Sequence, residues 1–182
     1  MADLTQDEHN LVSDLSQAMR DKSLLLADLA AKLGGVRSLG DVTGLLSDFV
    51  PRLVPCSFFV FYLCSAETGE LELAHVSNAR KKKSCAELAD SKLSSWIFAN
   101  RKPALVPADF LPVGGRHESI IAIPLISAGT DVGLIYVFTD LGADAISQQD
   151  METLQTLASF AGITCENVRL YLRMEEQNGL LS

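Results

Sequence analysis

The sequence predicts an α+β domain in which a central, mostly antiparallel sheet of five or six strands has helices packed on one face, with a long helix at each end. Three observations support this fold class. Residues 56–64 form a short apolar run, and residues 119–139 contain two apolar, β-branched runs joined by a tight turn. Long helical patterns cover residues 5–33 and 147–177. Strands and helices in this combination are typical of a layered α+β fold.

The first helix is expected to begin at Thr5, because Thr5-Gln-Asp-Glu8 matches a capping box. It should end at Leu33, since Gly34-Gly35 follows and glycine is favoured just past a helix end. Apolar residues recur along it every seven positions, at Val12, Met19, Leu26 and Leu33. This spacing favours packing along another helix.

A second helix is expected from Ser38-Leu-Gly-Asp41, another helix-start pattern, with Pro51 bending or ending it. The run 56–64 is apolar on both faces of the predicted strand, so this strand should be central and covered on both sides. A turn at 66–70 leads to a more alternating strand at 71–76, which suits the edge of the sheet.

Residues 77–86 read as a polar, basic loop, residues 87–100 as a helix and residues 104–107 as a short strand. The following loop contains glycine and proline. Two strands then meet at Ala128-Gly-Thr-Asp131, a connection short enough only for an antiparallel hairpin. Ser147-Gln-Gln-Asp150 resembles a capping box for the last helix.

Several short motifs occur in a fixed order in the second half of the chain: Ser94 to Pro103, Ser119, Pro124-Leu125, Val132-Gly-Leu134, Ser147 to Asp150 and Ala161 to Asn167. Together they resemble the corresponding strands and helices of a GAF domain. The resemblance covers about residues 38–172 and implies a GAF-like, profilin-like sandwich. We therefore expect a helical extension at 1–36, a GAF-like domain at 37–173, and a signalling helix that ends within 174–182.

The composition excludes several classes of function. The net charge of −8 disfavours nucleic-acid binding, which needs a basic surface. No apolar run approaches the roughly 18–20 residues that span a bilayer, and the acidic start does not resemble a signal peptide. The cysteines at 56, 64, 85 and 165 lack metal-site spacing, so we expect reduced thiols in a cytoplasmic protein without a metal. No cofactor is predicted.

Strand alternation places Ser57, Phe59 and Phe61 on one face of the central strand. The GAF resemblance implies that this face looks toward a ligand cavity. Further candidate ligand-binding residues are His75, Arg80, Trp96, Arg116, Ile121 and Tyr136. The basic run Arg80 to Lys83 favours a small, partly apolar, anionic ligand bound under the 77–86 loop. The alternative is a collapsed cavity filled by its own side chains.

No arrangement of nucleophile and base is visible, so we expect no enzyme activity. The resemblance offers three specialised roles, and the sequence departs from each. Phe138-Thr139-Asp140 replaces the Asn-Lys pair of cyclic-nucleotide GAF domains, and Cys85 is followed by Ala86 rather than the His of bilin-binding members. Free methionine sulfoxide reductases of this family need several loop cysteines, and only Cys85 lies in such a loop.

The predicted function is therefore a sensory or regulatory GAF-type domain that relays a change through its terminal helices to an output domain or partner protein. A ligand-free dimerisation or scaffold module is the alternative. In the last helix, an apolar stripe at alternating spacings of four and three favours a homodimer through the terminal helices, with packing inside one domain core as the alternative. Its members are Leu154, Ala158, Ala161, Cys165, Val168 and Leu172.

Overall fold

A five-stranded sheet forms the centre of the computed structural model, which describes the backbone of residues 2–180 and the side chains of residues 7–179. The strands are β1 (Phe58–Cys64), β2 (Leu71–Val76), β3 (Ala104–Pro107), β4 (Ser119–Ser127) and β5 (Thr130–Thr139). Their order is β2-β1-β5-β4-β3, and every neighbouring pair is antiparallel. The predicted α+β fold is confirmed.

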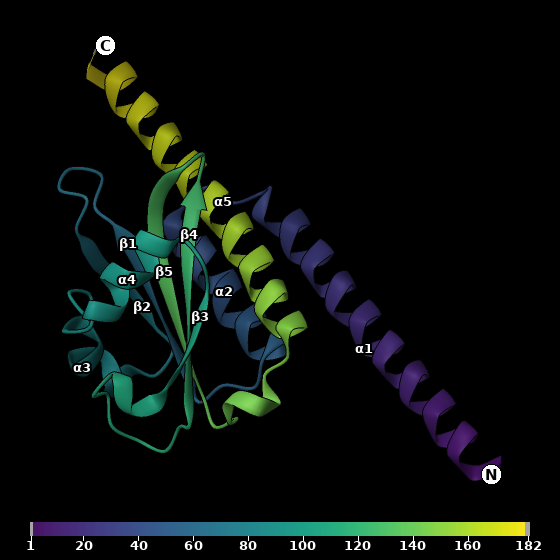
Figure 1. Cartoon of the computed structure of the whole chain (residues 1–182). Coiled ribbons are helices and arrows are strands. Elements are labelled where there is room, and N and C mark those ends of the chain that lie inside the picture. Colours follow the sequence, from purple (N-terminus) through teal and green to yellow (C-terminus); the bar gives the residue numbers. More distant parts are fainter. Residues whose placement is uncertain (1, 181–182) are drawn as a thin grey trace.

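Three long helices cover one face of the sheet (Figure 1): α1 (Ala2–Leu33), α2 (Leu39–Leu53) and α5 (Gln148–Leu180). α1 begins before Thr5, whose side chain lies outside the described residues, and it ends at Leu33 as predicted. α2 begins with the predicted capping box between Ser38 and Asp41 and continues through Pro51 to Leu53. In α5, the predicted Ser147–Asp150 box is formed by reciprocal side chain to backbone hydrogen bonds.

The apolar stripe of α5 is buried inside the domain. Leu154, Ala158, Ala161, Cys165 and Val168 pack into one cluster with residues of β1, β4 and β5, whereas Leu172 is 42% exposed. Gly162 allows this close packing, since a Cβ there would lie 3.2 Å from the carbonyl oxygen of Ile126 in β4. Most of the stripe therefore belongs to the domain core.

The opposite face of the sheet is covered by short elements. The segment predicted as a loop at 77–86 forms a 3-10 turn, η1 (Ala79–Lys81), and a short helix, α3 (Lys82–Ala86). α4 (Lys92–Asn100) begins later than the predicted helix at 87–100, because Ser91 is its N-cap and accepts a hydrogen bond from the Ser94 amide. The 3-10 turn η2 (Ala108–Phe110) follows β3, and η3 (Ala143–Ala145) precedes α5.

The β4–β5 hairpin turns on two residues, Ala128 and Gly129, between the paired Ser127 and Thr130. Both turn residues have positive φ, 49° and 82°. Positive φ at both positions is the type I′ geometry, whose twist matches that of the flanking strands. The predicted tight turn is thus confirmed, and the antiparallel pairing that follows from it places β5 in the middle of the sheet.

The outer part of α1 projects away from the domain (Figure 1). Its inner part packs on the domain through Leu29 and Leu33, which are buried, and Lys22 forms an ion pair with Asp150 at the start of α5. Within the described part of the chain, no helix combines the length and the apolar character that a membrane crossing requires.

Gly133 is required by the close approach of β5 to β1. A Cβ at this position would lie 2.2 Å from the carbonyl oxygen of Tyr62. We predict that Gly133→Ala lowers the free energy of unfolding by about 3 kcal/mol or more, because backbone clashes produce the large mutational losses. Urea denaturation monitored by circular dichroism measures this change.

The matched control is Gly44→Ala, at an exposed position in α2 where an added Cβ meets nothing within 4 Å. This variant should gain about 0.5–1 kcal/mol from helix propensity. A Gly133→Ala protein as stable as the wild type would contradict the packing of β1 against β5.

Candidate functional site

The candidate site is the sheet face beneath α3, α4 and the 111–117 segment, which is the face opposite the long helices. Buried apolar side chains from all of these parts form one cluster there. Its members are Phe58, Val60, Tyr62, Cys85, Leu88, Leu93, Ile97, Leu111, Val113, Ile120, Ala122, Leu134, Tyr136 and Phe138. A small molecule bound to this face would have to displace these side chains.

Two tyrosines from neighbouring strands occupy the middle of this face. The rings of Tyr62 and Tyr136 meet edge to face, with centroids 5.8 Å apart. The Tyr62 hydroxyl donates a hydrogen bond of 2.5 Å to the carbonyl oxygen of Cys85 at the end of α3. This bond joins the centre of the sheet to the helix that covers it.

The Tyr136 hydroxyl is held by the start of α4. It lies 2.7 Å from the Ser94 hydroxyl and 3.2 Å from the Ser91 hydroxyl. Ser94 in turn donates to the carbonyl of Leu88 at 3.1 Å. Burial raises the pKa of both Tyr62 and Tyr136, so both phenols stay protonated. The polar atoms of this face therefore bond one another.

Aromatic rings close the end of the face where β1 begins and β5 ends. Phe58 and Phe138 stack with centroids 4.3 Å apart and an interplanar angle of 10°. His117 meets both rings edge-on, at 6.0 Å and 5.1 Å. Burial lowers the pKa of His117, and the nearby Lys81 ammonium lowers it further, against an opposing effect of Asp140. A neutral imidazole suits this aromatic contact.

Lys81 fastens the glycine-containing loop over the sheet. Its Nζ donates hydrogen bonds to the carbonyls of Val113 at 3.2 Å and Gly114 at 2.5 Å. Gly114 and Gly115 have positive φ, 64° and 113°, which glycine adopts without strain. Lys81 was predicted as part of a basic run for an anionic ligand; in the structure its ammonium group binds backbone carbonyls.

The structure corrects the predicted orientation of the central strand. Phe59, Phe61 and Ile121 point into the cluster beneath the long helices, away from the face under α3 and α4. His75 also lies on the helix side, with its Nε2 3.0 Å from the Ser47 hydroxyl of α2. The GAF resemblance implies a cavity on the side of Phe59 and Phe61, whereas the structure places both side chains beneath the long helices; ligand binding by them stays a prediction.

Four other candidate residues lie at the surface. Ser57 is exposed and its hydroxyl donates to Asp140 Oδ1 at 2.8 Å. Arg80 and Arg116 are exposed, and Trp96 is 51% exposed on the outer side of α4. Of the predicted set, only Tyr136 lies in the cluster beneath α3 and α4. Binding of an anion under the 77–86 segment stays a prediction, and the space that it needs is filled.

Sequence reasoning missed Tyr62, Ser91, Ser94 and Lys81 as the residues that organise this face. Two signals for them were present in the sequence. A tyrosine within the otherwise apolar run 58–64 needs a partner for its hydroxyl when it is buried. Ser91 and Ser94 stand at a spacing that permits both a helix cap and a second hydroxyl on the same side.

The four cysteines lie largely in the core. All four are free, and Cys64, Cys85 and Cys165 are buried. Burial raises the pKa of Cys56, Cys64 and Cys85 to about 11 and that of Cys165 to about 12. Protonated thiols are poor nucleophiles. Among the residues that the structure describes, no group of His, Cys, Asp and Glu is arranged to hold a metal ion.

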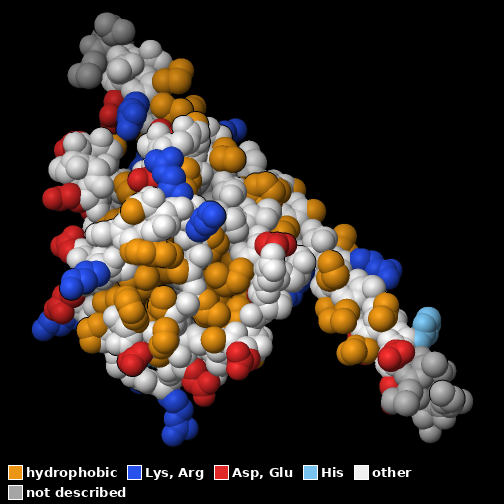
Figure 2. All heavy atoms as spheres, viewed as in Figure 1, with side chains coloured by type: hydrophobic (Ala, Val, Ile, Leu, Met, Phe, Trp, Pro, Cys, Tyr) orange, Lys and Arg blue, Asp and Glu red, His pale blue; other side chains and the backbone are white. Residues whose placement is uncertain are grey.

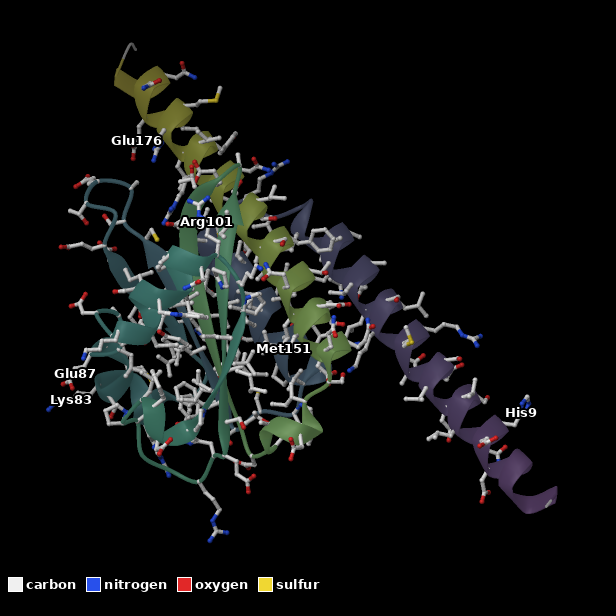
Figure 3. The ribbon with its side chains drawn as sticks, viewed as in Figure 1. His9, Lys83, Glu87, Arg101, Met151 and Glu176 are labelled. Atoms are coloured by element: carbon white, nitrogen blue, oxygen red, sulfur yellow. The ribbon has the colours of Figure 1, made fainter. Side chains whose placement is uncertain are left out.

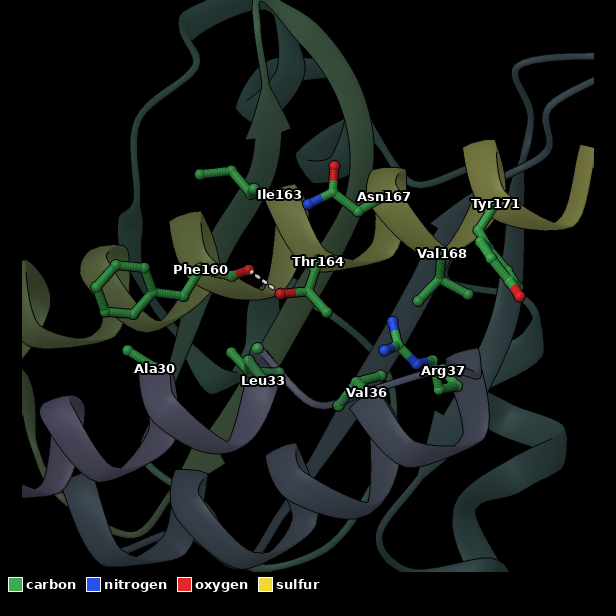
Figure 4. A pocket seen from close by; sticks show the side chains of 11 residues that line it. Ala30, Leu33, Val36, Arg37, Phe160, Ile163, Thr164, Asn167, Val168 and Tyr171 are labelled. Atoms are coloured by element: carbon green, nitrogen blue, oxygen red, sulfur yellow. Dashed lines mark hydrogen bonds between the residues drawn. The ribbon is translucent and has the colours of Figure 1, made fainter. Parts of the chain in front are cut away.

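A groove of about 330 Å³ lies between the end of α1 and α5, on the outside of the helical layer (Figure 4). Its lining combines apolar side chains with the guanidinium of Arg37 and the amide of Asn167. The Thr164 hydroxyl in this lining donates to the Phe160 carbonyl of its own helix at 2.9 Å. The lining contains no cysteine, histidine or carboxylate.

No protein-family model matches the sequence, and no curated protein sequence matches it either. Solved structures do match. The GAF domain of a phosphoenolpyruvate-protein phosphotransferase from Coxiella burnetii has a TM-score of 0.67 at 14% identity, covering 84% of this chain and 97% of that one. The chain has the GAF fold.

Two further GAF-fold comparisons differ in what the matched proteins do. The GAF domain of the potassium sensor histidine kinase KdpD from Escherichia coli has a TM-score of 0.60 at 19% identity, over 84% of this chain and 98% of that chain. Free methionine-R-sulfoxide reductase from Neisseria meningitidis has a TM-score of 0.66 at 17% identity, over 82% and 91%. The fold is thus common to signalling domains and an enzyme.

We predict that Tyr136→Phe lowers the free energy of unfolding by about 0.5–1.5 kcal/mol, the net value of a buried hydrogen bond. The loss should be modest because Ser91 and Ser94 still bond each other, at 2.8 Å. Urea denaturation provides the measurement. Tyr171→Phe, at an exposed tyrosine of α5, is the matched control and should be neutral. An equally neutral Tyr136→Phe would show that the hydroxyl network does not hold the cover in place.

Proposed function

We propose that this chain is a non-catalytic, cytoplasmic GAF-type regulatory domain in signal transduction, and that it works through its terminal helices without a small molecule on the sheet face. The filled face beneath α3 and α4 is the observation that carries the proposal. Its tyrosine and serine hydroxyls bond one another or backbone carbonyls, and its rings pack together. This favours the ligand-free assembly role over the ligand-sensing role.

The proposed partner is a second copy, bound through α1. Leu11, Val12, Leu15 and Met19 are each more than half exposed on the projecting part of this helix. At about 100° per residue, their side chains cover an arc of about 100°. Leu29 and Leu33, which pack on the domain, continue the same arc. An apolar stripe that runs past its own domain is the surface that a second helix would cover.

The second terminal helix supplies the readout in this proposal. α5 packs on the sheet through its first half and extends past the domain at the other end of the molecule (Figure 1). Leu170, Tyr171, Leu172 and Met174 are between 42% and 61% exposed there. An output domain or partner protein that contacts this part of α5 would sense how the two protomers are held. Signalling domains from the compared sensor kinase and phosphotransferase support such a role.

The dimer proposal predicts that replacing Leu11, Leu15 and Met19 together by Gln shifts the protein to a monomer. Burial of a large apolar side chain contributes about 1.5–3 kcal/mol, so losing three on each protomer removes most of the association energy. Light scattering after size-exclusion chromatography measures the mass at micromolar concentration.

Leu24→Gln is the matched control. Leu24 is 70% exposed and lies on the opposite side of α1 from the stripe, about 220° from Leu11. This variant should keep the wild-type mass. A wild-type chain that is monomeric at high micromolar concentration would contradict the proposal.

The absence of catalysis is tested with the substrate class of the compared reductase. The chain is incubated with free methionine-R-sulfoxide and dithiothreitol, and methionine is quantified. Because the pKa of Cys85 is raised to about 11 by burial, no methionine above the protein-free background is expected. Turnover that Cys85→Ser abolishes would instead establish an enzyme.

A further inference from the structure

A second hollow lies at one edge of the sheet, beside the filled face and away from the terminal helices. It measures about 340 Å³. It is lined by Lys92, Leu93, Trp96, Ala104, Leu105, Val106 and Phe110. Figure 2 shows hydrophobic side chains gathered on this side of the molecule, over β3 and α4. With the exception of Lys92, the lining is apolar.

The hollow follows the free edge of β3. β3 is the last strand of the sheet, bonded only to β4. Side chains of successive strand residues point to opposite faces. A hollow that touches Ala104, Leu105 and Val106 in succession must therefore run along the edge itself. The site has the shape that an extended chain lying beside β3 would fill.

The hydrogen-bonding pattern leaves backbone groups directed toward this hollow. The Ala108 amide donates to the Glu118 carbonyl at 3.1 Å, and β3 pairs with β4 in the same register. In an antiparallel ladder, bonded positions alternate, so Ala104 and Val106 direct their amide and carbonyl groups to β4. Leu105 directs its amide and carbonyl outward. Outward groups of this kind recognise an added strand.

Two aromatic rings overhang the hollow from different elements. Trp96 of α4 is 51% exposed and Phe110 of η2 is 57% exposed. An adjacent hollow shares Lys92, Leu93 and Phe110 with the hollow at the β3 edge and extends the apolar surface toward Leu111 and Pro112. Exposed aromatic rings beside an apolar hollow are typical of an interaction surface.

The lining of the hollow contains one charged side chain, that of Lys92 at the start of α4, which also lines the adjacent hollow together with Phe110. Arg101, at the far end of α4, is paired with Asp131 at 3.4 Å. Figure 3 shows Arg101 at the end of the domain near α5's exit. Asp109 follows β3 at the other end. An occupant with a carboxylate beside Lys92 would complement this charge.

We propose that this edge binds an extended segment of a partner protein, which adds as a strand to β3 and inserts one aromatic or leucine side chain between Trp96 and Phe110. An acidic residue of the segment lies near Lys92. A second copy of this chain is a poor occupant, because two identical hollows that face each other leave both unfilled. The proposal is independent of the helix-mediated function above.

Random 12-residue peptides displayed on phage are the probe. They are selected on the full chain and counter-selected on the Trp96→Ala/Phe110→Ala variant. Surviving peptides are synthesised, and their affinity is read from the fluorescence of Trp96, the only tryptophan of the chain. We expect survivors to share an aromatic or leucine residue close to Asp or Glu, and Lys92→Glu to weaken them at least tenfold. Lys82→Glu, at an exposed site on α3, is the control and should leave affinity unchanged.

Strand addition is tested by N-methylation of alternate amides in a selected peptide. Methylation in one register should abolish binding, whereas the other register should be tolerated, because only every second amide faces β3. Circular dichroism and thermal melting confirm that each variant is folded. If the double variant does not fold, Lys92→Glu replaces it as the target of the counter-selection. A selection that leaves no peptide after the counter-selection, survivors that ignore Lys92, equal effects of both methylation registers, or a change in oligomeric mass in the double variant would overturn the proposal.

Discussion

The central strands are apolar on both faces, and this constraint governs the rest of the molecule. Every residue of β1 is buried, and β4 and β5 are buried over most of their length. A sheet of this kind needs a cover on each side. The long helices provide one cover through a large apolar cluster, and α3, α4 and the loop after η2 provide the other. Two hydroxyls at the centre, from Tyr62 and Tyr136, fix the second cover to the sheet.

The two covers differ in what they leave for function. The short-element cover is closed by polar contacts in which the hydroxyls of Ser91, Ser94 and Tyr136 and the Lys81 ammonium already have partners. The helical cover buries one stripe of α5 and the inner part of α1 but leaves apolar residues along the projecting parts of both. The exposed apolar surface that could contact another chain therefore lies at the helix ends and along the β3 edge, outside the sheet face.

Local patterns were sufficient for most elements of the fold. The capping boxes at Ser38 and Ser147 and the two-residue hairpin turn depend on residues close in sequence, and the structure confirms them. The face of β1 could not be predicted in this way. All seven residues of the strand are apolar and buried, so the sequence carries no alternation that tells one face from the other. The sequence therefore could not show that Phe59 and Phe61 lie on the face that the long helices cover.

Other misjudged features depend on partners far away in the chain. The 82–86 helix lies next to Lys81, whose ammonium group donates hydrogen bonds to the carbonyls of residues 113 and 114. In the same helix, the carbonyl oxygen of Cys85 accepts a hydrogen bond from the Tyr62 hydroxyl. Similarly, the regular stripe of α5 is compatible with a second protomer or with its own sheet, and the close approach at Gly162 decides for the sheet. Such long-range contacts leave little trace in a local pattern.

The central claim is that the cover over the sheet face is an integral part of one cooperative core. Native-state alkylation tests it directly, since Cys85 and Cys165 are both fully buried, on opposite faces of the sheet. The protein is treated with iodoacetamide at increasing urea concentrations, and each cysteine is followed by peptide mass spectrometry. The account predicts that Cys85 and Cys165 become reactive with the same free energy of opening and the same urea dependence, those of global unfolding. Reaction of Cys85 at a much lower free energy, with little urea dependence, would show that the cover lifts locally and would contradict the account.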